Sequence, residues 1–243
     1  MEILTILWRE YTFFKHRFLK ITFSQMISPL LYLITFGVGL SGVVVEGKSY
    51  LFFILPGLLA MATTRNSYAA VSMRISITRL HEKSLECYIY SPTRMSHFAI
   101  GYILAGALRG FYAGLFTIVI GVITSSMSWS IMLFVVMLIN SVIFASIGFI
   151  AAMVIDTHYD LNRFTNMIIT PMTFLCGTFY SVSGLPWYFK AVIEWLPLTH
   201  TTRLMRRLFF GYGIDGFSLL ISLVYMALLL IFSVRICYEE IKD

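Results

Sequence analysis

The chain has 243 residues, of which 58% are hydrophobic and only 12% are charged, with a formal net charge of +6 and a mean hydropathy of +0.83. The charged fraction is about half the roughly 25% that is usual in soluble proteins, whose surfaces need charge for solubility. The same composition excludes intrinsic disorder. The basic residues lie between long apolar runs, which argues against a nucleic-acid-binding protein. The sequence therefore predicts an all-α integral membrane protein.

The N-terminal segment 2–20 is predicted to form an amphipathic helix. Apolar side chains recur at the spacing of one helix face: Ile3, Leu7, Tyr11, Phe14 and Phe18. Basic side chains occupy the opposite face: Arg9, His16 and Lys20. A helix of this kind lies flat at the membrane surface, in contact with membrane lipid. We therefore expect an interface helix ahead of the first span.

Six segments are predicted to cross the membrane, because a bilayer core of about 30 Å needs roughly 20 apolar residues per helix. They are residues 21–41, 50–71, 98–124, 131–155, 164–182 and 217–238. The fifth is the weakest, because four polar or helix-breaking residues interrupt it: Asn166, Thr170, Pro171 and Thr173. Together the segments predict one transmembrane domain over residues 1–243.

The orientation follows from the bias of Lys and Arg in the short loops. Eleven of these residues lie on the side that contains the termini, and five lie on the other side. Both termini are therefore expected in the cytoplasm.

Residues 42–49 satisfy the phosphate-loop pattern GxxxxGK[ST], which cradles nucleotide phosphates when it joins a strand to a helix. Here a predicted span precedes the pattern and another follows it. We therefore interpret Gly42–Ser49 as a turn between two spans, with no cofactor bound to this chain. The three cysteines, Cys87, Cys176 and Cys237, lie far apart without metal-ligand spacing, so no metal site is expected.

Three stretches carry a family resemblance. The second span contains PGLLAM at residues 56–61, and the cytoplasmic segment 79–94 reads RLHEKSLECYIYSPTR. The third stretch reads FLCGTFY at 174–180 and continues with LPW at 185–187 and LPLTH at 196–200. Together with the six-span count, these stretches resemble the type-2 ATP-binding-cassette exporter permeases.

The resemblance implies a non-enzymatic subunit of an ATP-driven exporter in the bacterial inner (plasma) membrane. Such a permease forms the substrate path as a dimer, with a second copy of itself or a related permease. Cytoplasmic ATP-binding-cassette ATPase subunits would bind ATP and Mg²⁺. The expected cargo is a polysaccharide, a glycolipid or an amphipathic drug-like molecule.

The cytoplasmic segment 78–90 is long enough for about three helical turns, and the residue before Pro92 disfavours helix. A short amphipathic helix suits docking into a groove of a partner protein. With the resemblance, this segment is expected to be the coupling helix that contacts the ATPase. Its candidate contact residues are His81, Glu82, Lys83, Leu85 and Glu86.

Residues 183–215 are too apolar for a free loop and too short to cross the bilayer as two helices. Pro186 and Pro197 suit first-turn positions, which predicts helices over about 186–196 and 198–210. The resemblance implies re-entrant helices that close the outer end of the path. The candidate gate residues are Phe174, Phe179, Tyr180, Trp187, Trp195, Arg203, Arg206 and Arg207. The arginines would bind either lipid phosphates or an anionic substrate.

Three polar residues within spans are candidates for the substrate path: Arg65, Arg109 and Asn140. Arg65 lies close enough to the cytoplasmic edge to extend its side chain there. Arg109 lies about 16 Å deep, and no span contains an Asp or Glu that could neutralise it. Its partners are therefore expected to be backbone carbonyls, water or cargo.

Alternatives remain for the class of the protein and for the packing of its third span. An intramembrane enzyme or an ion-driven carrier would act without an ATPase. An enzyme needs clustered His, Asp or Glu or an activated Ser at depth, and a carrier needs membrane carboxylates, but no span contains an Asp or Glu. Gly106, Gly110 and Gly114 form a small-residue face on the third span. That face would pack either against another span of the same chain or against a second copy.

Overall fold

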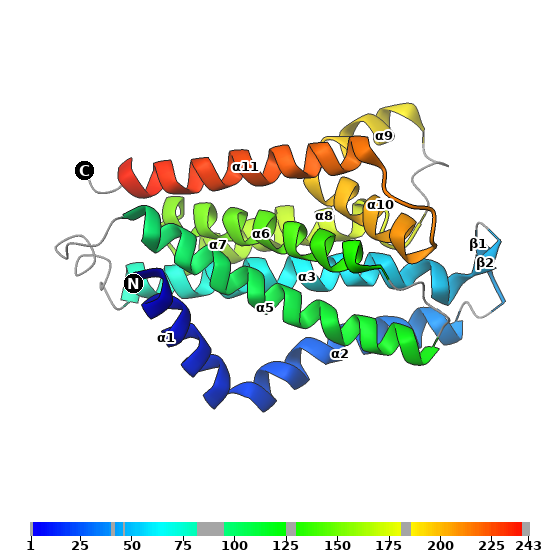
Figure 1. The fold of residues 1–243 in the computed structure, drawn as a ribbon, viewed down its shortest axis with the longest axis horizontal. Coiled ribbons are helices and arrows are strands. Elements are labelled where there is room, and N and C mark those ends of the chain that lie inside the picture. The colour runs from blue at the N-terminus through cyan, green and yellow to red at the C-terminus, as the bar shows by residue number, and fades with distance from the viewer. Residues whose placement is uncertain are drawn as a thin grey trace.

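A computed structural model describes residues 2–39, 42–45, 47–81, 95–124, 130–180 and 186–239. Most of the predicted coupling helix, including Glu82, Lys83, Leu85 and Glu86, lies outside these ranges, and only the backbone of His81 is described. The long helices are α2 (Phe18–Gly39), α3 (Tyr50–Ser76), α5 (Met95–Thr124), α6 (Ile131–Val154) and α11 (Gly216–Glu239). They form a bundle with both termini at one end (Figure 1).

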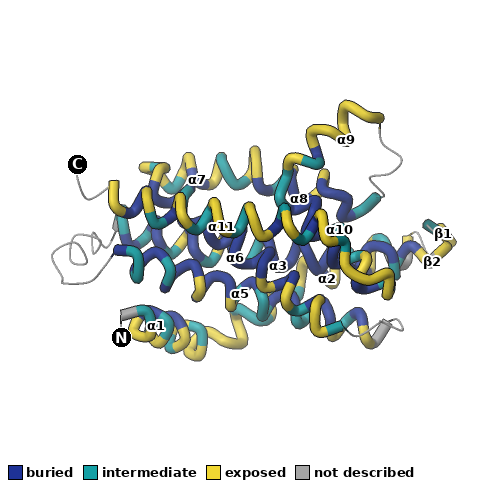
Figure 2. Tube along the Cα trace, turned by 45° about the horizontal axis from the view of Figure 1, so that its top comes forward, coloured by how far each residue is buried: buried dark blue, intermediate teal, exposed yellow. Residues whose placement is uncertain are grey.

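Within the described part of the chain, four helices are long and apolar enough to cross a membrane by length and composition: α2, α5, α6 and α11. The helix α3 has the length, but polar residues such as Arg65 and Asn66 lower its hydropathy. Figure 2 shows α3 and α6 largely buried, because neighbouring helices enclose them. Polar side chains are tolerated in α3 because protein, rather than lipid, surrounds them.

The glycines of α5 pack inside the chain. A Cβ atom added to Gly110 would lie 2.6 Å from the Ser67 side chain of α3, and one added to Gly106 would lie 2.1 Å from that of Val71. Gly114 is equally close to Thr63. The alternative in which this face packs against another span of the same chain is therefore confirmed. The helices α5 and α3 can approach closely because glycine has no side chain at these positions.

The predicted fifth span differs most from the structure. Three consecutive helical pieces replace it: α7 (His158–Phe164), the π-helical η2 (Thr165–Ile169) and α8 (Thr170–Leu175). The stretch begins earlier than residue 164, because the Thr157 side chain caps it by accepting a hydrogen bond from the Asp160 N–H at 3.0 Å. It ends before residue 182 because Gly177 turns the backbone at a φ of 77°.

Residues 42–45 and 47–49 form a turn between helices, as predicted. Within them, β1 (Val44–Val45) and β2 (Lys48–Ser49) pair antiparallel, and Gly47 has a φ of 75°. Such a φ is accessible to glycine at little cost. The phosphate-loop pattern therefore falls on a small hairpin that follows α2.

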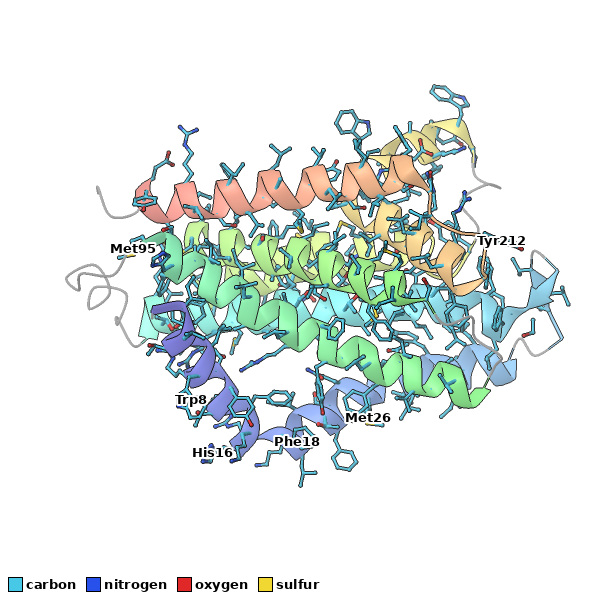
Figure 3. The ribbon with its side chains drawn as sticks, in the orientation of Figure 1. Trp8, His16, Phe18, Met26, Met95 and Tyr212 are labelled. Atoms are coloured by element: carbon cyan, nitrogen blue, oxygen red, sulfur yellow. The ribbon has the colours of Figure 1, made fainter. Side chains whose placement is uncertain are left out.

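The first helix, α1 (Glu2–His16), is inclined along α5 and meets α2 at an apex away from the bundle (Figure 1). Contacts with α5 hold it in this position. Ile6 contacts Gly101, and Phe14 stacks edge-on against Tyr112 with ring centroids 5.0 Å apart. Trp8 and His16 extend away from the bundle, consistent with an amphipathic helix (Figure 3).

Two short helices lie at the end opposite the termini, as predicted: α9 (Trp187–Glu194) and α10 (Pro197–Phe209). Their order and their proline starts agree with the sequence. The helix α10 packs against α3, α6 and α11, whereas α9 contacts mainly α10. Near the end of the bundle that carries the hairpin, α10 is therefore part of the packed bundle, whereas α9 lies at its periphery.

Candidate functional site

A pocket of about 250 Å³ lies between α2, α3 and the η2–α8 stretch, and we call it the polar groove. Its polar lining includes hydroxyl, amide and guanidinium groups from four elements: Ser24, Gln25, Ser28, Arg65, Asn66, Thr165 and Thr170. No carboxylate is among its lining residues. Of the three residues predicted to line a substrate path, only Arg65 lies here.

Several polar groups of the groove are available to a ligand. Gln25 has a buried Oε1 with no hydrogen-bond partner in the described part of the chain. Arg65 forms no ion pair with a described residue. The Asn66 side chain uses one N–H on the Ala62 carbonyl at 2.9 Å, which leaves its oxygen available. A buried polar atom without a partner is costly, so the groove is suited to polar molecules or water.

The π-helical piece forms one wall of the groove. The Tyr68 hydroxyl of α3 lies 3.0 Å from the Thr165 hydroxyl of η2, and Thr165 also donates to the Leu161 carbonyl at 2.8 Å. A π-helical turn is rare and is frequent at functional sites. This bond fixes η2 against α3 where the groove passes between them.

Aromatic side chains close the groove toward the hairpin end. Tyr32 lines the groove, and its ring lies 5.6 Å from that of Phe179. Phe179 also contacts Phe36 at 5.0 Å and stacks on Phe174 at 5.4 Å. The Tyr50 hydroxyl donates to the Phe179 carbonyl at 2.9 Å. Two predicted gate residues, Phe174 and Phe179, are thus brought together at one end of the groove.

The turn after α8 is held by α3 and α10. A Cβ atom on Gly57 would lie 2.4 Å from the carbonyl oxygen of Thr178, so this contact requires glycine. Arg206 of α10 donates to the Gly177 carbonyl, and its guanidinium lies 4.1 Å from the Phe53 ring centroid. Two of the sequence stretches that carry the family resemblance, at Gly57 and Gly177, therefore meet in space. Tyr180 donates back to the Leu175 carbonyl.

The remaining gate candidates lie apart from the aromatic cluster. Trp187 is 81% exposed and Trp195 is 79% exposed within the chain. Only Ile193 of α9 is fully buried, since this helix contacts little besides α10. Arg203 pairs with Glu194 at 3.2 Å, and Arg207 is exposed.

Arg109 has a carboxylate partner, contrary to the sequence-based expectation. Its guanidinium donates to Glu10 of α1 at 2.8 Å, and Glu10 also forms an ion pair with Arg74 at 3.1 Å. The Glu10 side chain is only 7% exposed and that of Arg109 only 16%. The sequence-based expectation considered only acidic residues within spans, whereas Glu10 lies on the interface helix.

Asn140 lies in the interior, outside the polar groove. Its amide N–H₂ donates to Thr63 at 2.8 Å and to Thr64 at 3.0 Å, and its oxygen accepts from Thr201 at 2.8 Å. The side chain therefore ties α6 to α3 and α10. Its hydrogen-bonding capacity is used by these partners, which explains how an amide is tolerated at full burial.

A second polar contact joins the end of α3 to the start of α7. Ser76 lies 2.8 Å from Nδ1 of His158, and Arg79 forms an ion pair with Asp156 at 2.9 Å. Arg79 belongs to η1 (Ile77–His81), which contains the first residues of the predicted coupling segment 78–90. The end of η1 is thus connected to the helical stretch that forms the wall of the groove.

The sequence analysis also missed Tyr32 and Phe36, which complete the aromatic cluster. Their spacing of four residues on one helix face was the available signal. Among the described residues, no group of three or more His, Cys, Asp or Glu could hold a metal ion. The candidate site is therefore a polar groove with an aromatic end.

These features define a multi-pass α-helical membrane protein of the transport permease class. Residues 1–210 match the family described as ABC-2 type transporter, and the chain belongs to this family. It is 25% identical to the inner membrane transport permease YadH of Escherichia coli (strain K12), over 93% of this chain and 91% of that protein. Nodulation protein J of Rhizobium leguminosarum bv. trifolii is 26% identical, over 85% of this chain and 80% of the relative.

The nodulation protein J of Rhizobium meliloti (strain 1021) is also 26% identical, over 84% of this chain and 79% of that protein. The similarity thus extends over most of the length of each relative. The resemblance in the sequence motifs is confirmed, and the chain is a bacterial inner-membrane protein.

Proposed function

We propose that this chain is the membrane-spanning subunit of an ATP-driven exporter in which the polar groove forms half of the substrate path. The observation that carries the proposal is the groove itself, a polar surface between helices of a chain that belongs to a transporter family. Six spans would comprise α2, α3, α5, α6, the α7–η2–α8 stretch and α11. Both termini would lie in the cytoplasm, consistent with the Lys and Arg bias of the loops.

The lining of the groove supports a hydroxyl-rich or amphipathic cargo. Hydroxyl and amide groups exchange hydrogen bonds with sugars, and the neighbouring aromatic rings of Tyr32 and Phe179 offer apolar faces. Polysaccharides, glycolipids and amphipathic drug-like molecules share this chemistry. The groove is open on one side, so a second copy or a related permease would complete the path.

The aromatic cluster would close the path at its outer end. Opening it requires separation of Phe174 and Phe179 from Tyr32 and Phe36 of α2. Arg206 and Gly57 hold the turn that carries Phe179, so a movement of α10 would be transmitted to the cluster. We assign Trp187 and Trp195 to the membrane–water interface, where tryptophan is enriched.

Coupling to ATP hydrolysis would pass through residues 78–90. His81, Glu82, Lys83, Leu85 and Glu86 remain the proposed contacts with cytoplasmic ATP-binding-cassette ATPase subunits, which would carry ATP and Mg²⁺. The contacts of Arg79 with Asp156 and of Ser76 with His158 connect the start of this segment to the start of α7, which continues into η2. A shift of the coupling segment would therefore change the groove wall.

The proposal is tested by purifying the affinity-tagged chain from its host membranes in mild detergent. We expect a dimer of permease chains with ATP-binding-cassette subunits, and ATP-dependent transport after reconstitution into proteoliposomes. A Glu86→Arg variant should remain in the membrane but lose transport. Transport by the purified permease without an ATPase would favour an ion-driven carrier. Chemical conversion of a substrate by the permease alone would favour an intramembrane enzyme.

A further inference from the structure

A second pocket, of about 340 Å³, lies between α1 and α5, and we call it the α1 pocket. Most of its lining is apolar or aromatic, including Leu7, Phe14, Leu108 and Tyr112. The ion pair between Glu10 and Arg109 forms its polar side. The arms α1 and α2 meet at an apex away from the bundle, with His16 and Phe18 on either side of it (Figure 3).

Arg109 lines this pocket, and Arg17 lies beside it, near the ring of Phe13. The guanidinium of Arg17 lies 5.0 Å from the ring centroid of Phe13, and that of Arg109 lies 5.3 Å from the same centroid. Arg17 is exposed and forms no ion pair with any residue in the described ranges. Glu10 is shared between Arg109 and Arg74, so a single carboxylate faces more than one positive charge. The pocket thus has an apolar wall, and its surroundings, which include Arg17 and Arg74, carry an excess of positive charge.

The depth of the pocket matches the boundary between lipid headgroups and acyl chains. The 30 residues of α5 extend about 45 Å, which exceeds a hydrocarbon core of about 30 Å. About 15 Å of α5 therefore lies outside that core if its other end is at the membrane boundary. Arg109 follows Met95 by about 21 Å of helix, and its side chain points back toward the start of α5 to reach Glu10. Its guanidinium is therefore close to the boundary.

We propose that the α1 pocket binds one anionic phospholipid from the leaflet next to the chain termini. The lipid phosphate would contact Arg17 and Arg109. Arginine is well suited to bind phosphate, because its guanidinium offers two parallel N–H donors. One acyl chain would lie along Phe14, Leu108 and Tyr112. The charge of the headgroup selects the lipid, and the bound lipid fills the space between α1 and α5.

The test uses the full-length chain, stripped of lipid in detergent, and native mass spectrometry with dioleoyl phosphatidylglycerol or dioleoyl phosphatidylcholine. The acyl chains of the two lipids are identical, so a difference reports the headgroup. We expect one retained phosphatidylglycerol per chain. Arg17→Gln should weaken its binding about five-fold, the effect of one basic residue near an anionic surface.

Ala105→Phe tests the apolar wall, because Ala105 lines the pocket and a phenyl ring would fill it. This variant should lose the retained lipid without a change in charge. Arg235→Gln is the matched control: Arg235 is 74% exposed on α11, near the same end of the bundle, and its replacement should leave binding unchanged. If Ala105→Phe fails to fold, the comparison of Arg17→Gln with Arg235→Gln still tests whether the pocket binds the lipid.

Equal retention of both lipids, or equal losses in Arg17→Gln and Arg235→Gln, would overturn the proposal. Displacement of the lipid by millimolar inorganic phosphate would overturn it as well, since the pocket would then select a free anion. The measurement needs neither ATPase nor cargo. Its failure is therefore distinguishable from a failure of the proposed function.

Discussion

Replacement of Glu10 by Gln should destabilise the chain strongly, because it leaves Arg109 without its carboxylate. The Glu10 side chain is 7% exposed, and that of Arg109 is 16% exposed. Removing one partner of a buried ion pair costs about 3–5 kcal/mol. Partial exposure of Arg109 and Arg74 lets water reach them, so we expect about 3 kcal/mol, the lower end of that range.

The assay is a double-mutant cycle by thermal unfolding in detergent, with Glu10→Gln, Arg109→Gln and the double variant. A loss of about 3 kcal/mol lowers the melting temperature by about 6–12 °C in a chain of this size. The loss in unfolding free energy of the double variant should be only about half of the sum of the two single losses, because neither charge is left without its partner. The exposed pair Arg235–Glu239 is the control, with a coupling energy of about 0.5 kcal/mol or less. Additive effects at Glu10 and Arg109 would refute the reasoning.

Three further substitutions follow from the packing and the hydrogen bonds. Gly57→Ala should cost about 1–3 kcal/mol, because the new methyl group meets backbone 2.4 Å away. Gly121→Ala, the control, has no neighbour within 3.8 Å and should keep the melting temperature or raise it slightly, because alanine favours a helix. Asn140→Leu should cost about 1–3 kcal/mol in denaturant unfolding, since it removes the bonds of the amide to three buried threonine hydroxyls; Thr63 and Thr201 keep a backbone carbonyl, and a wild-type midpoint would contradict this. Burial lowers the pKa of His200, and the nearby positive charge of an arginine lowers it further. The hydrogen bond between its Nε2 and a backbone carbonyl opposes this shift only in part. As the pH falls, this imidazole is therefore protonated in the unfolded chain before it is protonated in the folded chain. The stability that it contributes is complete above pH about 6.5 and should fall at lower pH. A His200→Gln variant whose melting temperature depends on pH as steeply as that of the wild type would contradict this.

Local hydropathy predicts the long apolar helices well. The last span is predicted over 217–238 and observed over Gly216–Glu239, and the fourth is predicted over 131–155 and observed over Ile131–Val154. Each is apolar around most of its circumference, so length and composition alone define its ends. The two short helices after residue 186 were predictable for another local reason, since proline marks both starts.

Contacts between distant residues could not be predicted in the same way. The wall of the groove depends on Tyr68 meeting Thr165, 97 positions later, and no local pattern indicates this pairing. The partner of Arg109 is 99 positions away on α1, where Glu10 looks like an ordinary polar residue of a surface helix. The sequence predicts the helices, whereas their mutual packing selects which polar residues share a site.

The most direct test of the central claim measures whether ATP changes the accessibility of the polar groove. Ser28→Cys, which lines the groove, is compared with Ile27→Cys, which lies at the same depth on α2 outside the groove and is 54% exposed. Both are made in a cysteine-free chain assembled with its ATPase, and a water-soluble maleimide measures labelling with and without ATP. The account predicts a labelling rate that changes with ATP at residue 28 and not at residue 27. Equal rates at residue 28 in the two states would contradict the assignment of the groove to the substrate path.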